Sequence, residues 1–306
     1  MHYREALDAY HKLKSSDVNY SIRWISPAVS CLLAAGSVVD RSVVDRIEFE
    51  KSVQGYAAAC GLQDVLSGNY SSQVRTGKQG STYSRLTRLT THSEVETCNA
   101  VINDLIFEQF SGFSVSIVTL LGKVVGELHD NVASHANGVG FSAAQVYDDG
   151  GSRRIEFAII DAGCGMLKNV RIVNSTIATD PEAIDWCLKR GNTTAKAATD
   201  GWEQRVPEDM AVSPFPQSTK KVTSDNHHMG EGLWTLSELI RITNGSLWIL
   251  SGAGEYRYLN GRESVRHSSF SWPGVAIEFE LIVPKDSQLH VSRESDLERL
   301  GKRLGI

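Results

Sequence analysis

Hydrophobic and polar residues follow two periods along this chain, and the changes of period predict the order of its helices and strands. In the first third of the chain, segments of the two kinds alternate, and Ser26 before Pro27 predicts a helix start with serine as the cap. The expected elements here are a helix over 4–14, a strand over 18–25, a helix over 27–35, a strand over 43–49, a helix near 52–60 and a strand over 83–89. This βαβα order predicts a small α/β domain over residues 1–92.

Longer elements are expected in the rest of the chain. The expected elements are a helix over 94–110, a second helix from after Gly112 to about Ala136, strands over 141–147 and 154–160, a helix over 231–243 and a strand over 275–283. Asp148-Asp-Gly-Gly-Ser152 between the first two strands is a hairpin signal. The second helix should bury an apolar stripe that recurs every four residues, namely Val124, Leu128, Val132 and Ala136.

Polar side chains share another face of that second helix. Glu127, Asn131 and His135 also recur every four residues, roughly 100° around the axis from the apolar stripe. An amide oxygen can coordinate Mg²⁺, while a carboxylate one turn away can orient or deprotonate a water that attacks a phosphate. A solvated helix face with an i,i+4 hydrogen bond has the same spacing. Glu127 is the candidate catalytic residue, and Asn131 is the candidate metal and nucleotide ligand.

A carboxylate stands where the second hairpin strand should end. Asp161 is followed by Gly163, Gly165 and Met166. A carboxylate can accept a hydrogen bond from an exocyclic amine, glycines leave room for a flat base, and a thioether packs adaptably against it. An ordinary β-turn uses Asp and Gly for conformational reasons alone. These four residues are candidates for binding a base.

A third cluster opens the helix expected over 231–243. Gly230 and Gly232 stand at its start and Leu233 follows them. Backbone N–H groups and the helix dipole favour anions there, and glycines let a phosphate approach closely. A GxG sequence before a helix is also common without such a function.

The segment over about 191–230 has little hydrophobic periodicity and many polar residues. A long irregular insertion inside a domain is usually functional or disordered, and its place before Gly230 predicts a lid over the nucleotide. Thr193 and Lys196 offer a hydroxyl and a cation that can contact phosphates when the lid closes. Ordinary solvated loop chemistry is the alternative.

Composition and charge narrow the class of protein. The 306 residues have a formal net charge of -5 and no basic block, which does not favour electrostatic binding of nucleic acid. The five cysteines show no CxxC spacing, which indicates free thiols in a reducing cytoplasm. Ser, Pro and Gly interrupt the longest apolar run, over 24–39, and the N-terminus lacks a signal-peptide pattern. We therefore expect a cytoplasmic protein without a membrane span.

The sequences ELHDN at 127–131, DAGCGM at 161–166 and GEGL at 230–233 resemble the GHKL superfamily, which includes gyrase, the ninety-kilodalton heat-shock chaperones, histidine kinases and MutL. The resemblance implies an ATP-binding domain over 93–306 with the Bergerat fold, a two-layer α/β sandwich with a mixed, mainly antiparallel sheet and helices on one face. The smaller domain before it resembles STAS-like modules in its order of elements.

The same resemblance implies roles for individual residues. Glu127 would be the general base, Asn131 would hold Mg²⁺, Asp161 would bind the adenine amine, and Gly163, Gly165, Gly230 and Gly232 would shape the pocket. Trp272-Pro-Gly-Val275 resembles the family's Gly-Thr element, but Val275 stands where the family has threonine. Ser269 and Ser271 are the candidates to replace that hydroxyl.

Three functions follow from the resemblance. The first is slow Mg²⁺-dependent ATP hydrolysis coupled to lid closure and to regulation of a partner protein, which Glu127 favours. The second is phosphoryl transfer to a partner's serine, as in anti-sigma-factor kinases, and the third is an ATP-gated interaction module without turnover. A histidine kinase is disfavoured, because His92 precedes only one candidate helix. The partner and the oligomeric state have no signal in the sequence.

Overall fold

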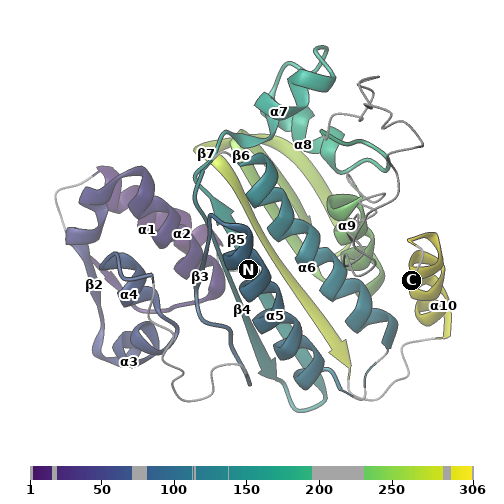
Figure 1. The fold of residues 1–306 in the computed structure, drawn as a ribbon, viewed down its shortest axis with the longest axis horizontal. Helices are drawn as coiled ribbons and strands as arrows, with labels where there is room; N and C mark the ends of the chain where they lie inside the picture. The colour runs from purple at the N-terminus through teal and green to yellow at the C-terminus, as the bar shows by residue number, and fades with distance from the viewer. Residues whose placement is uncertain are drawn as a thin grey trace, which may run out of the picture.

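A five-stranded antiparallel sheet with helices against it forms the centre of the molecule (Figure 1). The computed structural model describes residues 3–15, 19–70, 81–111, 113, 115–136, 138–194, 231–284 and 291–304. Its strands are β1 (Tyr20–Ile22), β2 (Ile47–Phe49), β3 (Thr87–Leu89), β4 (Gly140–Asp148), β5 (Ser152–Asp161), β6 (Ser246–Leu259) and β7 (Arg262–Pro284). Its helices are α1 (Tyr3–Ser15), α2 (Pro27–Val39), a 3₁₀ turn η1 (Arg41–Arg46), α3 (Lys51–Ala59), α4 (Leu62–Leu66), α5 (His92–Gln109), α6 (Val115–His135), α7 (Gly165–Val173), α8 (Asp180–Cys187), α9 (Gly232–Thr243) and α10 (Val291–Arg303).

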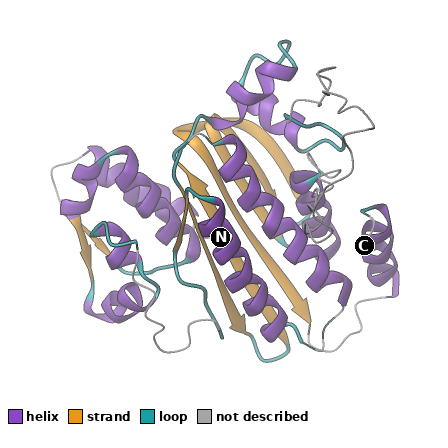
Figure 2. Cartoon of the chain, in the orientation of Figure 1, coloured by secondary structure: helices purple, strands orange, loops and turns teal. Residues whose placement is uncertain are grey.

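The strands of the central sheet, drawn in orange in Figure 2, lie in the order β3-β4-β5-β7-β6, and every neighbouring pair is antiparallel. The predicted hairpin is confirmed, since β4 pairs with β5 and Asp161 is the last residue of β5. The predicted α/β class is confirmed as well. A mixed sheet was expected, but every pair in the described part of this sheet is antiparallel. The parallel pair among the described strands, β1 with β2, forms a separate sheet.

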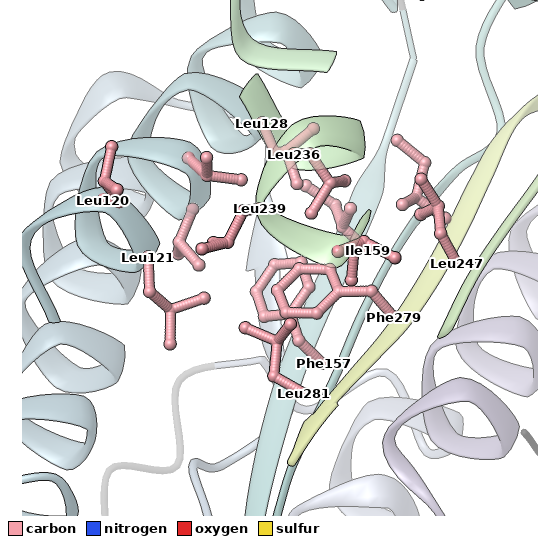
Figure 3. Close-up of a cluster of buried hydrophobic side chains, with 14 of the residues drawn as sticks. Leu120, Leu121, Leu128, Phe157, Ile159, Leu236, Leu239, Leu247, Phe279 and Leu281 are labelled. Atoms are coloured by element: carbon pink, nitrogen blue, oxygen red, sulfur yellow. The ribbon is translucent and has the colours of Figure 1, made fainter. Parts of the chain in front are cut away.

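One face of the sheet is covered by α5, α6 and α9 (Figure 1). Alternate residues of each strand point to this face, as the two-residue period of a strand requires, so Phe157 of β5 stacks on Phe279 of β7 with ring centroids 4.9 Å apart. Leu128 of α6 and Leu236 of α9 pack above them (Figure 3). The predicted apolar stripe of α6 is buried throughout, which confirms the orientation of that helix.

The opposite face of the sheet is also covered, although the sequence predicted helices on one face only. Helix α2 packs there against β4 and β5, and eleven of its thirteen residues are buried. Small side chains on both surfaces permit the close approach: Ala158 faces the helix, and the Cys31 thiol donates to the Ala158 carbonyl at 3.5 Å. The N-terminal elements therefore share a hydrophobic core with the main sheet.

Two predictions about the N-terminal segment differ from the structure. The strand expected over 83–89 was assigned to the small α/β layer, but β3 pairs with β4 at the edge of the main sheet. The strand expected over 43–49 begins only at Ile47, because the Asp40 carboxylate accepts from the Ser42 N–H and starts the 3₁₀ turn η1. The β1-α2-β2 unit itself is present as predicted, with parallel strands.

Helices α7 and α8 stand at the end of the sheet where β5 ends (Figure 1). A bulge in β6 holds the start of α8: the Ala253 N–H donates to the Asp180 carboxylate at 2.9 Å. Gly252 has a positive φ of 56°, and a Cβ on Gly252 or Gly254 would overlap Asp180 or its neighbour. This contact across more than seventy residues fixes the direction in which α8 leaves the sheet.

Candidate functional site

A cavity of about 550 Å³ opens between α6, the end of the sheet and helices α7, α8 and α9. Its size falls in the range of small-molecule sites. The residues predicted for the site that line it are Glu127, Asn131, Asp161, Gly165, Met166, Thr193, Gly232 and Leu233. Four sequence segments thus meet in one place, and the first and last of them, at Glu127 and Leu233, are 106 positions apart.

Asp161 lies at the deep end of the cavity and is 3 % exposed. Burial raises the pKa of its carboxyl to about 6, and hydrogen bonds from the backbone N–H groups of Gly163 and Val275 partly oppose this rise. The Gly163 N–H donates to Oδ1 at 2.8 Å. A carboxylate has about four acceptor positions, so two such bonds leave capacity for a ligand donor.

Close packing around Asp161 explains why the neighbouring positions 163 and 274 are glycines. A Cβ on Gly163 would overlap the Ala136 carbonyl at the end of α6, and a Cβ on Gly274 would overlap Asp161 itself. Gly163 does not line the cavity among its described residues, so its small size serves the packing of the turn. Gly165 does line it and has a positive φ of 72°, a conformation that favours glycine.

Glu127 lies on α6 where α9 begins. A Cβ on Gly232 would stand 2.6 Å from Glu127 Oε2, so the glycine lets the two helices meet at the carboxylate. Oε1 is buried and has no hydrogen-bond partner among the described residues. Burial raises the pKa of Glu127 to about 7, opposed by Lys123 and reinforced by the negative charges of Glu231 and Asp130. This carboxyl therefore exchanges protons near neutral pH.

Asn131 is exposed on α6, one helical turn beyond Glu127, and both line the cavity. No group of three or more His, Cys, Asp or Glu side chains that could hold a metal ion is found in the described part of the chain. The described lining includes no Lys or Arg, whereas Glu96, Glu127, Asp130 and Asp161 all belong to it. The charged side chains in the described lining are therefore acidic.

The lid and the third glycine cluster are only partly described. Thr193 lines the cavity in the short segment after α8, together with Trp186 and Cys187 of that helix. Gly232 and Leu233 line it at the start of α9. Lys196, Gly230 and most of the lid predicted over 191–230 lie outside the described residues.

Two features of the site were missed in the sequence. The Ser251 hydroxyl of β6 accepts from the Met166 N–H at 2.8 Å and so fixes the start of α7. This contact joins residues 85 positions apart and leaves no local signal in the sequence.

Ser269 and Ser271, the expected replacements for a threonine at Val275, are exposed and do not line the cavity in its described part.

The second missed feature is His129, inside the ELHDN sequence and fully buried. Burial lowers its pKa to about 3, so the ring is neutral and carries one N–H. Nδ1 lies 2.5 Å from the Asn99 amide oxygen and Nε2 lies 2.8 Å from the Ser142 hydroxyl. Because an amide oxygen only accepts, Nδ1 carries the hydrogen and Ser142 donates to Nε2. Its position four residues after the buried Val125 is the signal that could have shown its burial.

No protein-family model, no curated protein and no solved structure matches the chain. None of the helices in the described ranges is long and apolar enough to cross a membrane. The residues of the cavity and their chemistry therefore carry the functional argument.

Proposed function

We propose that the protein binds ATP with Mg²⁺ in this cavity and hydrolyses it slowly, as a member of the GHKL type with a Bergerat fold. The observation that carries the proposal is the placement of Asp161 and Glu127 in one cavity with different surroundings. Asp161 has hydrogen-bond donors around it, whereas Glu127 has a buried oxygen without a donor among the described residues. The first arrangement suits recognition and the second suits proton transfer.

At the deep end, Asp161 accepts a hydrogen bond from the exocyclic amine of adenine. Val132, Met166 and Ile277 line the cavity around it and provide apolar surface for a flat base. The carboxylate is mostly ionised at neutral pH, since its pKa is about 6. A hydrogen bond to a charged acceptor contributes about 1.5–3 kcal/mol, which is enough to select a base that carries an amine.

At the other end, Glu127 takes a proton from the water that attacks the terminal phosphate. Its pKa of about 7 suits a general base, because such a group is effective when its pKa lies near the working pH. Only the ionised form accepts the proton, so turnover rises with pH, reaches half of its maximum near pH 7 and levels off about one pH unit higher. Bound phosphates repel the ionised carboxylate, which raises the pKa of Glu127 and moves the rise in turnover to higher pH.

The residues of the cavity fit a metal that shares its ligands with the nucleotide. Mg²⁺ usually takes few protein ligands and fills its coordination sphere with water and phosphate oxygens. Asn131 would provide the amide oxygen. Oε1 of Glu127 is buried without a hydrogen-bond partner among the described residues, and the described lining has several acidic side chains and no Lys or Arg. When bound, the ion would neutralise phosphate charge in these acidic surroundings.

The test separates binding from turnover in wild type and in Glu127→Ala. Binding of ATP is measured by calorimetry, and phosphate release is followed at saturating ATP with Mg²⁺. We expect the variant to bind ATP within about threefold of wild type and to lose at least about a hundredfold in turnover, the usual contribution of a general base. Unchanged hydrolysis in Glu127→Ala would exclude the general-base role.

Two further outcomes distinguish the alternative functions. Radiolabelled ATP incubated with the protein and candidate partners leaves label on protein only if the phosphoryl group is transferred to a serine. ATP binding without phosphate release or labelling would indicate an ATP-gated interaction module. Neither binding nor turnover would contradict the nucleotide site itself.

A further inference from the structure

Residues 272–275, called the wall below, lie against Asp161 and connect the exposed arm of β7 to its buried part; of these four residues, Val275 lines the cavity. The Val275 N–H is directed at the Asp161 carboxyl, and Gly274 lies so close that a Cβ there would overlap Asp161. The Trp272 indole N–H donates to the backbone carbonyl of Asp161 at 2.7 Å. The wall is thus attached to Asp161 through both its side chain and its backbone.

The far side of this wall rests on the N-terminal helices. The Trp272 ring is 1 % exposed and packs edge-on against Tyr10 of α1, with centroids 5.5 Å apart and planes at 74°. Tyr10 in turn covers Gly36 of α2 so closely that a Cβ on Gly36 would overlap the Tyr10 ring. A continuous set of packed groups therefore runs from α2 through Tyr10 and Trp272 to Asp161.

We propose that Tyr10 and Trp272 are positioning residues for Asp161, through which the N-terminal helices set the geometry of the base-binding end of the cavity. Neither residue lines the cavity in its described part, so both act through Asp161 and not by contact with a ligand. Close-packed aromatic groups transmit a displacement because the interior has no free volume to absorb it. Binding of a partner that moves α1 would change nucleotide affinity, and nucleotide would change that partner's affinity by the same factor.

Gly36→Ala and Gly55→Ala form a matched pair of variants in the N-terminal helices. In Gly36→Ala the new Cβ would overlap the Tyr10 ring and so displace it, whereas a Cβ on Gly55 of α3 meets nothing within 4 Å. Tyr10→Ala removes the ring and Tyr10→Phe keeps it. Trp272→Phe keeps an aromatic ring and removes the indole donor.

The first measurement needs no nucleotide. Amide hydrogen exchange is followed at Gly163 and Val275, whose N–H groups are directed at the Asp161 carboxyl, and at Thr235, whose N–H donates to the Glu231 carbonyl at 2.7 Å. We expect exchange at the first two amides to accelerate about tenfold in Gly36→Ala, Tyr10→Ala and Trp272→Phe, with Thr235 unchanged. Gly55→Ala and Tyr10→Phe should behave as wild type.

The second measurement rests on the proposed function. The ATP dissociation constant should rise about fivefold in the three perturbing variants with little change in kcat, because Glu127 lies at the other end of the cavity. If wild type binds no nucleotide, the proposed function fails while the exchange data still decide this inference. Wild-type exchange at Gly163 and Val275 in Gly36→Ala and Trp272→Phe would overturn it. Equal acceleration at Thr235 would also overturn it, because the N-terminal helices would then support the whole fold and not this wall.

Discussion

The two ends of the cavity are built differently around their carboxylates. Asp161 is almost completely buried, and its oxygens receive backbone N–H groups from two segments. Glu127 is only partly buried, and one of its oxygens has no donor in the described part of the chain. Both pKa values are raised mainly by burial, but hydrogen bonds oppose the shift only at Asp161. A carboxylate held by backbone donors keeps one geometry, while one without donors remains available for a proton.

The largest expected effect is on stability and depends on pH. The pKa of Asp161 is raised from 3.8 to about 6 in the folded protein, so the folded state holds this proton to higher pH than the unfolded state. The stability that protonation provides is complete below about pH 4 and is lost as the pH rises through 6. The loss amounts to about 3 kcal/mol, from two pKa units.

The comparison with Asp161→Asn isolates this effect, because an amide does not titrate. Urea unfolding between pH 4 and 8 should show the free energy of unfolding of wild type falling relative to the variant by up to about 3 kcal/mol, then a constant difference above about pH 7. A difference that does not vary with pH would mean that Asp161 has an ordinary pKa.

The next largest effect concerns base selectivity. Asp161→Asn should weaken ATP binding by about 10- to 100-fold, because a hydrogen bond to a charged acceptor contributes about 1.5–3 kcal/mol. Inosine triphosphate lacks the exocyclic amine, so its affinity should be weak in wild type and nearly unchanged in the variant. Calorimetry with both nucleotides measures the difference. Equal losses for both ligands would contradict recognition of the amine.

A smaller effect is expected at the Glu127 end of the cavity. In Gly232→Ala the new Cβ lies 2.6 Å from Glu127 Oε2, so the carboxylate has to move. We expect kcat to fall about tenfold, since a displaced catalytic group loses much of its contribution, while the preference for ATP over inosine triphosphate stays as in wild type. Gly126→Ala on α6 is the control, because its Cβ meets nothing within 4 Å. A loss of base preference in Gly232→Ala would show that the two ends are not independent.

The smallest effect is expected from Val275→Thr. The substitution keeps the β-branched shape in β7 and adds a hydroxyl to the cavity lining next to Asp161. A new hydrogen bond contributes about 0.5–1.5 kcal/mol, part of which is lost to desolvation, so ATP should bind about threefold more tightly. Val275→Ile adds volume without a hydroxyl and should not tighten binding. Unchanged affinity in both variants would show that this side chain does not face the base.

The sequence predicted those parts of the site that depend on local patterns. The stripe on α6 fixed which face carries Glu127 and Asn131, and the end of an apolar run fixed Asp161 as the last residue of β5. Helix α9 ends as predicted, with Asn244 in the left-handed conformation and the Gly245 N–H bonded to the Ile240 carbonyl. In each case the signal lies within a few residues of the feature it predicts.

The parts that were missed depend on contacts between distant segments. The position of α8 is set by the hydrogen bond from Ala253 in the β6 bulge to Asp180, and the position of the wall behind Asp161 by the hydrogen bond from Trp272. The 3₁₀ turn η1 is a local exception: it replaces the first part of an expected strand because the Asp40 carboxylate accepts a hydrogen bond from the Ser42 N–H. Apolar periodicity carries no information about such pairings, so the sequence could not supply them.

Helix α2 limits how the chain can be shortened in the laboratory. A fragment that starts at residue 93 would lose α2 and also β3, the edge strand that pairs with β4. Its outer sheet face would then expose Phe141, Trp248 and Trp272 to water, an apolar patch of the kind that causes aggregation. Expression of residues 93–306 as a stable fragment therefore needs either the native N-terminal helices or polar replacements on that face.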